Sequence, residues 1–221
     1  PKTAGTALGY AFDYSTLRRV FWDYDQNYRF AQDMQPEIRD NIGFISTYFQ
    51  MIFGHFYVTK YMDILPNVSY LTCIRHPVDR IISQYYHVAQ DSDNWPGKAI
   101  RDGEMNVVDF AKMPNIADAQ TAHLKGKALE DFGHVFLTED LAKSALVFQK
   151  KFGFSFLVPI PSLNTRQQRD DAVSNGTQRQ ANKIAQVTEA DKQQIYRLCG
   201  QDIDLYRQSN ERHKAEADKY V

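Results

Sequence analysis

The sequence has few cysteines and almost no net charge, so neither feature identifies a binding partner. Its 221 residues include only two cysteines, Cys73 and Cys199, which lie far apart along the chain. We therefore expect two reduced thiols and no disulfide, which favours a cytoplasmic protein. Basic and acidic residues almost balance, with a formal net charge of -1. This excludes a general electrostatic case for nucleic acid or an anionic membrane, so any anion site must come from a local cluster of basic residues.

Long apolar runs are also missing. No stretch approaches the ~18 uninterrupted apolar residues of a spanning helix, and even residues 44–61 are broken by Gln50, His55 and Lys60. We expect no membrane span in these residues. The sequence starts at Pro1 without an initiator methionine or a signal sequence, so we expect it to be part of a longer chain with a strand just upstream.

The apolar pattern predicts an α/β fold. A hydrophobic content of 43% over 221 residues supports one core, so we expect residues 1–221 to form a single domain. Residues 68–74 and 133–137 have the composition of buried strands, and helical spacing follows each, from residue 78 and over 139–152. We predict a P-loop-like three-layer domain with a central, mostly parallel sheet flanked by helices, with ligands at the carboxyl ends of the strands.

Other segments carry weaker predictions. Pro96 and two glycines predict a surface loop over 91–103. We expect helices over 107–125 and 189–206, and a tail from Gln208 that is either a solvated helix end or frayed.

Two loops carry candidate anion sites. The first, Lys2-Thr3-Ala4-Gly5-Thr6-Ala7, leads into a helix, whose unpaired N–H groups and positive dipole end favour a phosphate or sulfate, although an ordinary helix cap explains the pattern as well. The second runs from Arg75 at the end of a predicted strand to Ser83, and both side chains could converge on one phosphate. The alternative is that Arg75 or Arg80 pairs with Asp79 or Asp63 on the surface.

Together the two loops resemble the signature of PAPS-dependent sulfotransferases, where PAPS is 3′-phosphoadenosine-5′-phosphosulfate. That signature combines a PKT loop for the 5′-phosphosulfate with an RxPxxRxxSxY segment for the 3′-phosphate; here they read Pro1-Lys2-Thr3 and Arg75 to Tyr85. Further stretches are similar to the carbohydrate-type branch that includes heparan sulfate 2-O-sulfotransferase. They are 53–55, 119–121, 137–141, 163–165 and 202–206.

The resemblance implies roles for these residues. Lys2 would contact the bridging oxygen and stabilise the leaving phosphate, while the backbone of Thr3, Ala4, Gly5, Thr6 and Ala7 cradles the 5′ end. Arg75 and Ser83 would hold the 3′-phosphate. Because a lysine and oriented amides can stabilise the developing charge, we expect no metal requirement. Asn164 and Arg169, and less closely Arg166, lie in a late loop that closes over the nucleotide in this family; a solvated basic loop is equally plausible.

The resemblance also implies a general base. His55 follows a glycine at the position where the 2-O-sulfotransferase branch places its catalytic base, and a histidine can take the proton of an acceptor hydroxyl. In that branch a second histidine precedes the glycine, whereas this chain has Phe53. The alternative for His55 is a structural histidine. We expect Glu139 to mark a helix start and Tyr85 and Tyr86 to lie in the core or in a pocket wall.

The predicted activity is therefore transfer of a sulfuryl group from PAPS to a hydroxyl of an acceptor, either a carbohydrate or another small molecule. Two alternatives stay open: a P-loop phosphotransferase that uses ATP or GTP, and a non-catalytic nucleotide-binding module. Aromatic residues between Tyr10 and Phe30 could stack on sugar rings or line an apolar cleft. A bacterial protein would act in the cytoplasm, and a eukaryotic one in the Golgi lumen.

Overall fold

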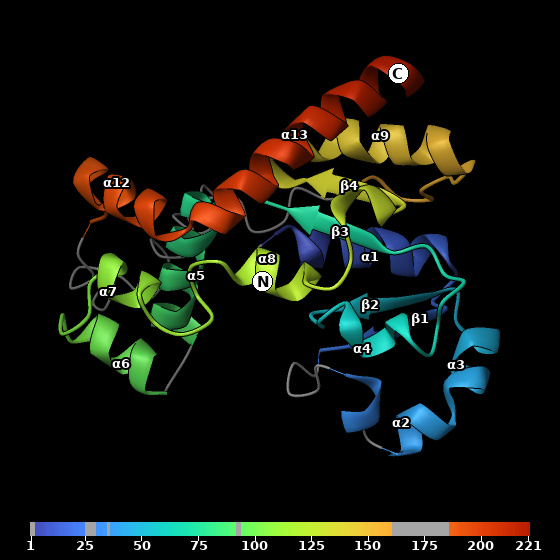
Figure 1. The fold of residues 1–221 in the computed structure, drawn as a ribbon, viewed down its shortest axis with the longest axis horizontal. Helices are drawn as coiled ribbons and strands as arrows, with labels where there is room; N and C mark the ends of the chain where they lie inside the picture. Colours follow the sequence, from blue (N-terminus) through green and yellow to red (C-terminus); the bar gives the residue numbers. More distant parts are fainter. Residues whose placement is uncertain (1–2, 25–29, 35, 92–93, 161–185) are drawn as a thin grey trace. The chain divides into compact units, whose positions relative to one another are not determined.

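The computed structural model (Figure 1) describes residues 3–24, 30–34, 36–91, 94–160 and 186–221. The chain divides into two compact units. We name the part with both sheets the sheet unit; it contains Thr3–Ile74, Gln120–Pro161 and Arg207–Val221. The other, the helical unit, contains Arg75–Ala119 and the described part of Ser162–Tyr206. The expectation of one domain stays a prediction.

The sheet unit is built around two pairs of parallel strands. β1 (Val20–Asp23) pairs with β2 (Met51–Gly54), and β3 (Leu71–Ile74) pairs with β4 (His134–Leu137). Short helices connect β1 to β2: the 3₁₀ turn Ala31–Asp33, α2 (Pro36–Asp40) and α3 (Ile42–Tyr48). Because the strands are parallel, β1 and β2 end side by side, at Asp23 and Gly54. The α/β class and the parallel pairing agree with the prediction.

Helix α1 (Gly5–Ser15) packs on both pairs of strands. Its buried Leu8 and Phe12 share an apolar cluster with Phe53 of β2, Cys73 of β3 and Phe136 of β4. Helix α9 (Leu141–Phe152) adds Phe148 to the same cluster. This packing fixes the start of α1 relative to the ends of the strands. The remaining short elements of the unit are α4 (Thr59–Met62), α8 (Ala119–Leu124) and the 3₁₀ turns Leu129–Asp131 and Thr138–Asp140.

The helical unit has its own core. It contains α5 (Pro77–Asp91), α6 (Trp95–Arg101), α7 (Val107–Ala111), α12 (Glu189–Leu198) and the start of α13 (Gly200–Tyr220). Ile81 and Tyr85 of α5, Ile100 of α6, Phe110 of α7 and Ile195 of α12 are buried together. Proline at the start of α5 suits its first turn, where no N–H is needed. Both Tyr85 and the thiol of Cys199 lie in this core, and neither Cys73 nor Cys199 forms a disulfide.

Two predictions about local structure are wrong, and a third is right only in part. Residues 91–103 do not form a loop throughout, because α6 occupies much of the segment, with the Asn94 side chain accepting a hydrogen bond from the Gly97 N–H at its start. The helix predicted over 107–125 is two short helices, α7 and α8. The tail after Gln208 is a helix end, since α13 continues to Tyr220, but it is not solvated throughout, because Ser209, His213 and Ala217 are buried.

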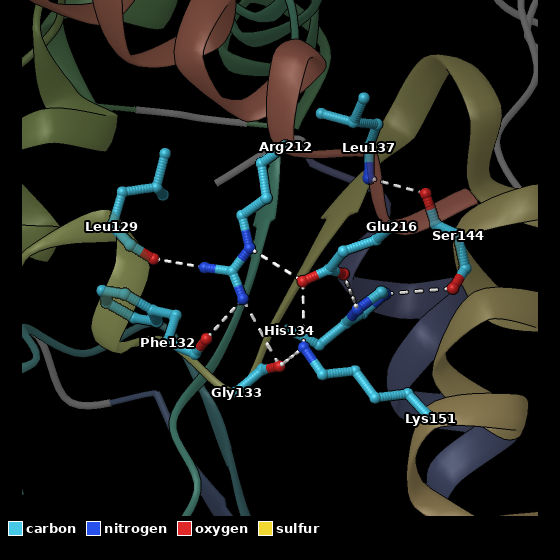
Figure 2. A network of polar contacts seen from close by, with 9 residues as sticks. All are labelled: Leu129, Phe132, Gly133, His134, Leu137, Ser144, Lys151, Arg212 and Glu216. Atoms are coloured by element: carbon cyan, nitrogen blue, oxygen red, sulfur yellow. Dashed lines mark hydrogen bonds and ion pairs between the residues drawn. The ribbon is translucent and has the colours of Figure 1, made fainter. Parts of the chain in front are cut away.

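A polar network holds the last part of α13 in the sheet unit (Figure 2). Glu216 accepts hydrogen bonds from Arg212 Nε at 3.0 Å and Lys151 Nζ at 2.9 Å, and lies 3.1 Å from His134 Nδ1. The other ring nitrogen of His134 lies 3.0 Å from the Ser144 carbonyl. His134 is fully buried, and both of its ring nitrogens lie at hydrogen-bonding distance from an oxygen atom. Arg212 also donates to the carbonyls of Leu129 and Phe132.

Acid should weaken this network. Burial raises the pKa of Glu216, but the hydrogen bonds from His134, Lys151 and Arg212 outweigh it and lower the pKa to about 2. The carboxylate therefore stabilises the fold fully above its unfolded pKa of about 4.5, and this contribution is lost as the pH falls from there towards 2. We expect Glu216→Gln to lower the free energy of unfolding by about 2 kcal/mol at pH 7, allowing for partial solvent screening. Urea unfolding at pH 7, 5 and 3 checks this.

The exposed Glu211 on the same helix provides the matched control. Glu211→Gln should change stability by no more than about 0.5 kcal/mol. A Glu216→Gln protein that keeps its disadvantage unchanged down to pH 3 would contradict the role of the carboxylate charge.

Candidate active site

The first anion loop has an open helix N-terminus. Ala4 is the N-cap of α1 and adopts a left-handed backbone conformation, with φ 55° and ψ 17°. Alanine has no side-chain acceptor and is a poor N-cap, so no side chain at this position caps the helix. A non-glycine residue in this region costs on the order of 1 kcal/mol. The first-turn N–H groups of Gly5, Thr6 and Ala7 are thus those of a helix terminus suited to an anion. Lys2 lies outside the described residues.

His55 lies beside this loop. A methyl group placed on Gly5 would be 3.5 Å from His55 Nε2, which is ordinary van der Waals contact. The structure therefore brings together two features that the sequence separates by about fifty residues. The chain order α1, β1, β2 explains the meeting, because α1 packs on β2 and His55 follows the end of that strand.

The backbone around His55 leaves no choice of residue at position 54. In the parallel register Gly54 faces Asp23, and the His55 N–H donates to the Asp23 carbonyl at 3.0 Å. A Cβ on Gly54 would lie only 1.4 Å from that carbonyl oxygen. Glycine before His55 is therefore required for the strand ends to approach, which gives the motif glycine a steric reason.

An aromatic side chain directly after β1 lies against His55. The Tyr24 ring meets the imidazole edge to face, with centroids 5.1 Å apart and an interplanar angle of 82°. Tyr24 also stacks on Trp22, with an interplanar angle of 10°. About half of each ring is exposed, 43% for Trp22 and 50% for Tyr24. Gly9 of α1 allows this arrangement, because a Cβ there would lie 2.8 Å from the indole.

The second candidate site is in the helical unit, where several residues of the RxPxxRxxSxY segment are buried and have structural roles. Arg75 directly follows β3 and is partly buried, and Ser83 is buried on α5. Pro77 begins the helix, and Tyr85 is buried and donates to the Met105 carbonyl at 3.2 Å. The prediction that Tyr85 belongs to the core is confirmed.

Arg80 has a structural role that the sequence did not suggest. It is fully buried, and its Nη2 lies 3.7 Å from Asp202 Oδ2. The same atom donates to the carbonyls of Ile116 and, at 2.8 Å, Ala117. The expectation that Arg80 pairs with Asp79 or Asp63 on the surface is wrong, because burial removes it from both; His76 Nδ1 lies 3.7 Å from Asp79 instead.

Some of the other candidate site residues lie within the described residues and some lie outside them. Asn164, Arg166 and Arg169 lie outside them. Glu139 falls in a 3₁₀ turn just before α9, as expected of a helix start, but the N-cap Asp140 makes no capping bond and its carboxylate contacts His213 at 3.0 Å. His134 is structural (Figure 2). Among the described residues, no group of three or more His, Cys, Asp or Glu is placed to hold a metal ion, and no helix is long and apolar enough to span a membrane.

Comparison with known proteins gives one match. The model of the sulfotransferase family matches residues 1–207, which include both anion-site segments and His55. Neither a curated protein nor a solved structure matches the chain.

Proposed function

Since the chain belongs to the sulfotransferase family, we propose that it transfers the sulfuryl group of PAPS to a hydroxyl of an acceptor, with His55 as the general base. The acceptor oxygen forms a bond to sulfur while the bond from sulfur to the 5′-phosphate oxygen breaks. The proton of the hydroxyl goes to His55, and the products are a sulfated acceptor and 3′-phosphoadenosine-5′-phosphate (PAP).

The proximity of His55 Nε2 to Gly5 carries this proposal. A sulfuryl group held by the first-turn N–H groups of α1 would lie next to an imidazole that can take the proton of the attacking hydroxyl. In the same proposal Lys2 and these N–H groups stabilise the charge that develops on the leaving phosphate.

The nucleotide would be held at both ends. Thr3 to Ala7 and Lys2 take the 5′-phosphosulfate, and Arg75 and Ser83 take the 3′-phosphate. Asn164 and Arg169 are further candidates for the nucleotide. Charge-assisted hydrogen bonds from an arginine are the strongest contacts available to a phosphate, so Arg75 should dominate the affinity for the 3′ end.

The exposed pair Trp22 and Tyr24 supports a carbohydrate acceptor. Flat aromatic faces beside a general base offer a stacking surface for the apolar face of a sugar ring, and Tyr24 adds a hydroxyl for hydrogen bonding. A sugar stacked there would bring its hydroxyls towards His55.

Calorimetric titration with PAP tests the donor site. We expect metal-independent binding, equal in magnesium and in EDTA, that Arg75→Ala weakens by about 2 kcal/mol, or about 30-fold, because a charged hydrogen bond is lost. Arg197→Ala, at an exposed arginine of the same unit, is the control and should leave binding unchanged. Absence of PAP binding, or a preference for magnesium-ATP, would overturn the proposal in favour of a phosphotransferase.

A further inference from the structure

A buried ion pair lies at the end of β1, next to the candidate base. Lys60 Nζ is 2.7 Å from Asp23 Oδ2, and the two side chains are only 1% and 4% exposed. The Tyr61 hydroxyl donates to the same carboxylate oxygen, also at 2.7 Å. Burial, and then the hydrogen bond to Asp23, raises the pKa of the Tyr61 phenol, so it remains a donor at all ordinary pH values. Two donors on consecutive residues of α4 therefore clamp one carboxylate.

The clamped residue is the one that holds the backbone of His55. The Asp23 carbonyl accepts the His55 N–H at 3.0 Å, and Gly54 packs against that carbonyl without room for a side chain. The next residue, Tyr24, places its ring against the imidazole. Asp23 thus connects to His55 both directly, through the main chain, and through its neighbour's ring. A shift of Asp23 would move both contacts of His55.

A buried ion pair is a poor source of stability, because the desolvation of both charges offsets their attraction. An apolar pair of similar size would stabilise the packing between α4 and β1 equally well. What a charged clamp adds is a single defined geometry, because the lysine and the phenol both require the carboxylate at one place. Precise placement matters most at a group that transfers a proton.

We propose that Asp23, Lys60 and Tyr61 are positioning residues that fix the imidazole of His55 for proton transfer. This inference rests on the proposed function of His55.

Lys60→Met is the first test, since it leaves the Asp23 carboxylate buried without its cation. We expect kcat to fall by about 10- to 100-fold, the cost of a misplaced reacting group, with the KM for PAPS and the affinity for PAP within twofold of wild type. The ¹⁵N shifts of the His55 ring nitrogens should change. Lys60→Arg, which keeps the charge, should restore most of the rate. Lys143→Met, at an exposed lysine of α9 in the same unit, is the matched control.

The measurements distinguish a failure of this inference from a failure of the proposed function. A Lys60→Met protein that is less stable but keeps wild-type kcat and unchanged His55 shifts would reduce the clamp to a structural role and overturn the inference. Should wild type bind no PAP, the proposed function fails, while the ring shifts of His55 in the same variants still report whether the clamp positions it. If Lys60→Met does not fold, Tyr61→Phe removes one hydrogen bond without stranding a charge and is read out in the same way.

Discussion

Replacing His55 by alanine should lower kcat by about 10²- to 10⁴-fold, the usual contribution of a general base. The affinity for PAP should stay within about twofold of wild type, because the nucleotide is proposed to bind through other residues. The loss should therefore appear in kcat and not in the KM for PAPS, as expected for an interaction made in the transition state. Steady-state kinetics with a panel of sugar acceptors, together with calorimetry for PAP, measures both quantities.

The exposed His87 on α5 is the control for this experiment, and His87→Ala should keep wild-type kinetics. Added imidazole should restore part of the rate of His55→Ala, because the vacated space lies beside Gly5, where a small base can enter. If His55→Ala keeps a third or more of wild-type kcat, another group takes the proton and the assignment of His55 fails.

The elements that the sequence predicted well are those with local signals. The strand before Arg75, the strand before Thr138 and the helix that ends at Phe152 all have unbroken apolar patterns, and β3, β4 and α9 lie there. The start of α1 followed from a short loop and helical spacing. The candidate base was found through its glycine, and the structure now supplies the steric reason for that glycine.

Other elements were missed. β1 and β2 were not predicted as strands, although they have the same length as β3 and β4. Helix α6 was read as a loop because of Pro96 and Gly97, although an asparagine followed by a proline is also typical of a helix start. The correct choice depended on Ile100, whose place in the core of the helical unit is not visible from the segment alone.

Contacts between distant segments were out of reach altogether. The tail of α13 looked solvated because its residues alternate in charge, yet Glu216 contacts Lys151 of α9, His134 of β4 and Arg212 of its own helix (Figure 2). The charge of Asp23 gave no sign that Lys60 would neutralise it. Likewise, the sequence of residues 202–206 indicates only a similarity to the sulfotransferase branch, whereas the structure shows that Asp202 pairs with Arg80 of the RxPxxRxxSxY segment.

That partnership predicts the largest effect on stability. Arg80→Met should lower the free energy of unfolding by about 3–5 kcal/mol, the cost of breaking a buried pair by removing one member. The change leaves a fully buried carboxylate on Asp202 without its cation, and the Ile116 and Ala117 carbonyls without their donor. Asp202 also lies at the first turn of α13, where its own N–H donates to Asp118 at 3.0 Å. Urea unfolding followed by circular dichroism measures the loss.

A double variant separates charge from packing. Arg80→Met with Asp202→Asn removes both charges, so it should recover about 2 kcal/mol or more of the loss, as expected when an ion pair is replaced as a unit. Because the Arg80→Met change breaks a buried contact of α5, hydrogen exchange should show increased opening of this helix. Arg80 does not contact the nucleotide in this interpretation, so PAP binding should weaken only if Arg75 and Ser83 are displaced. An Arg80→Met protein within 1 kcal/mol of wild type would contradict this structural role of Arg80.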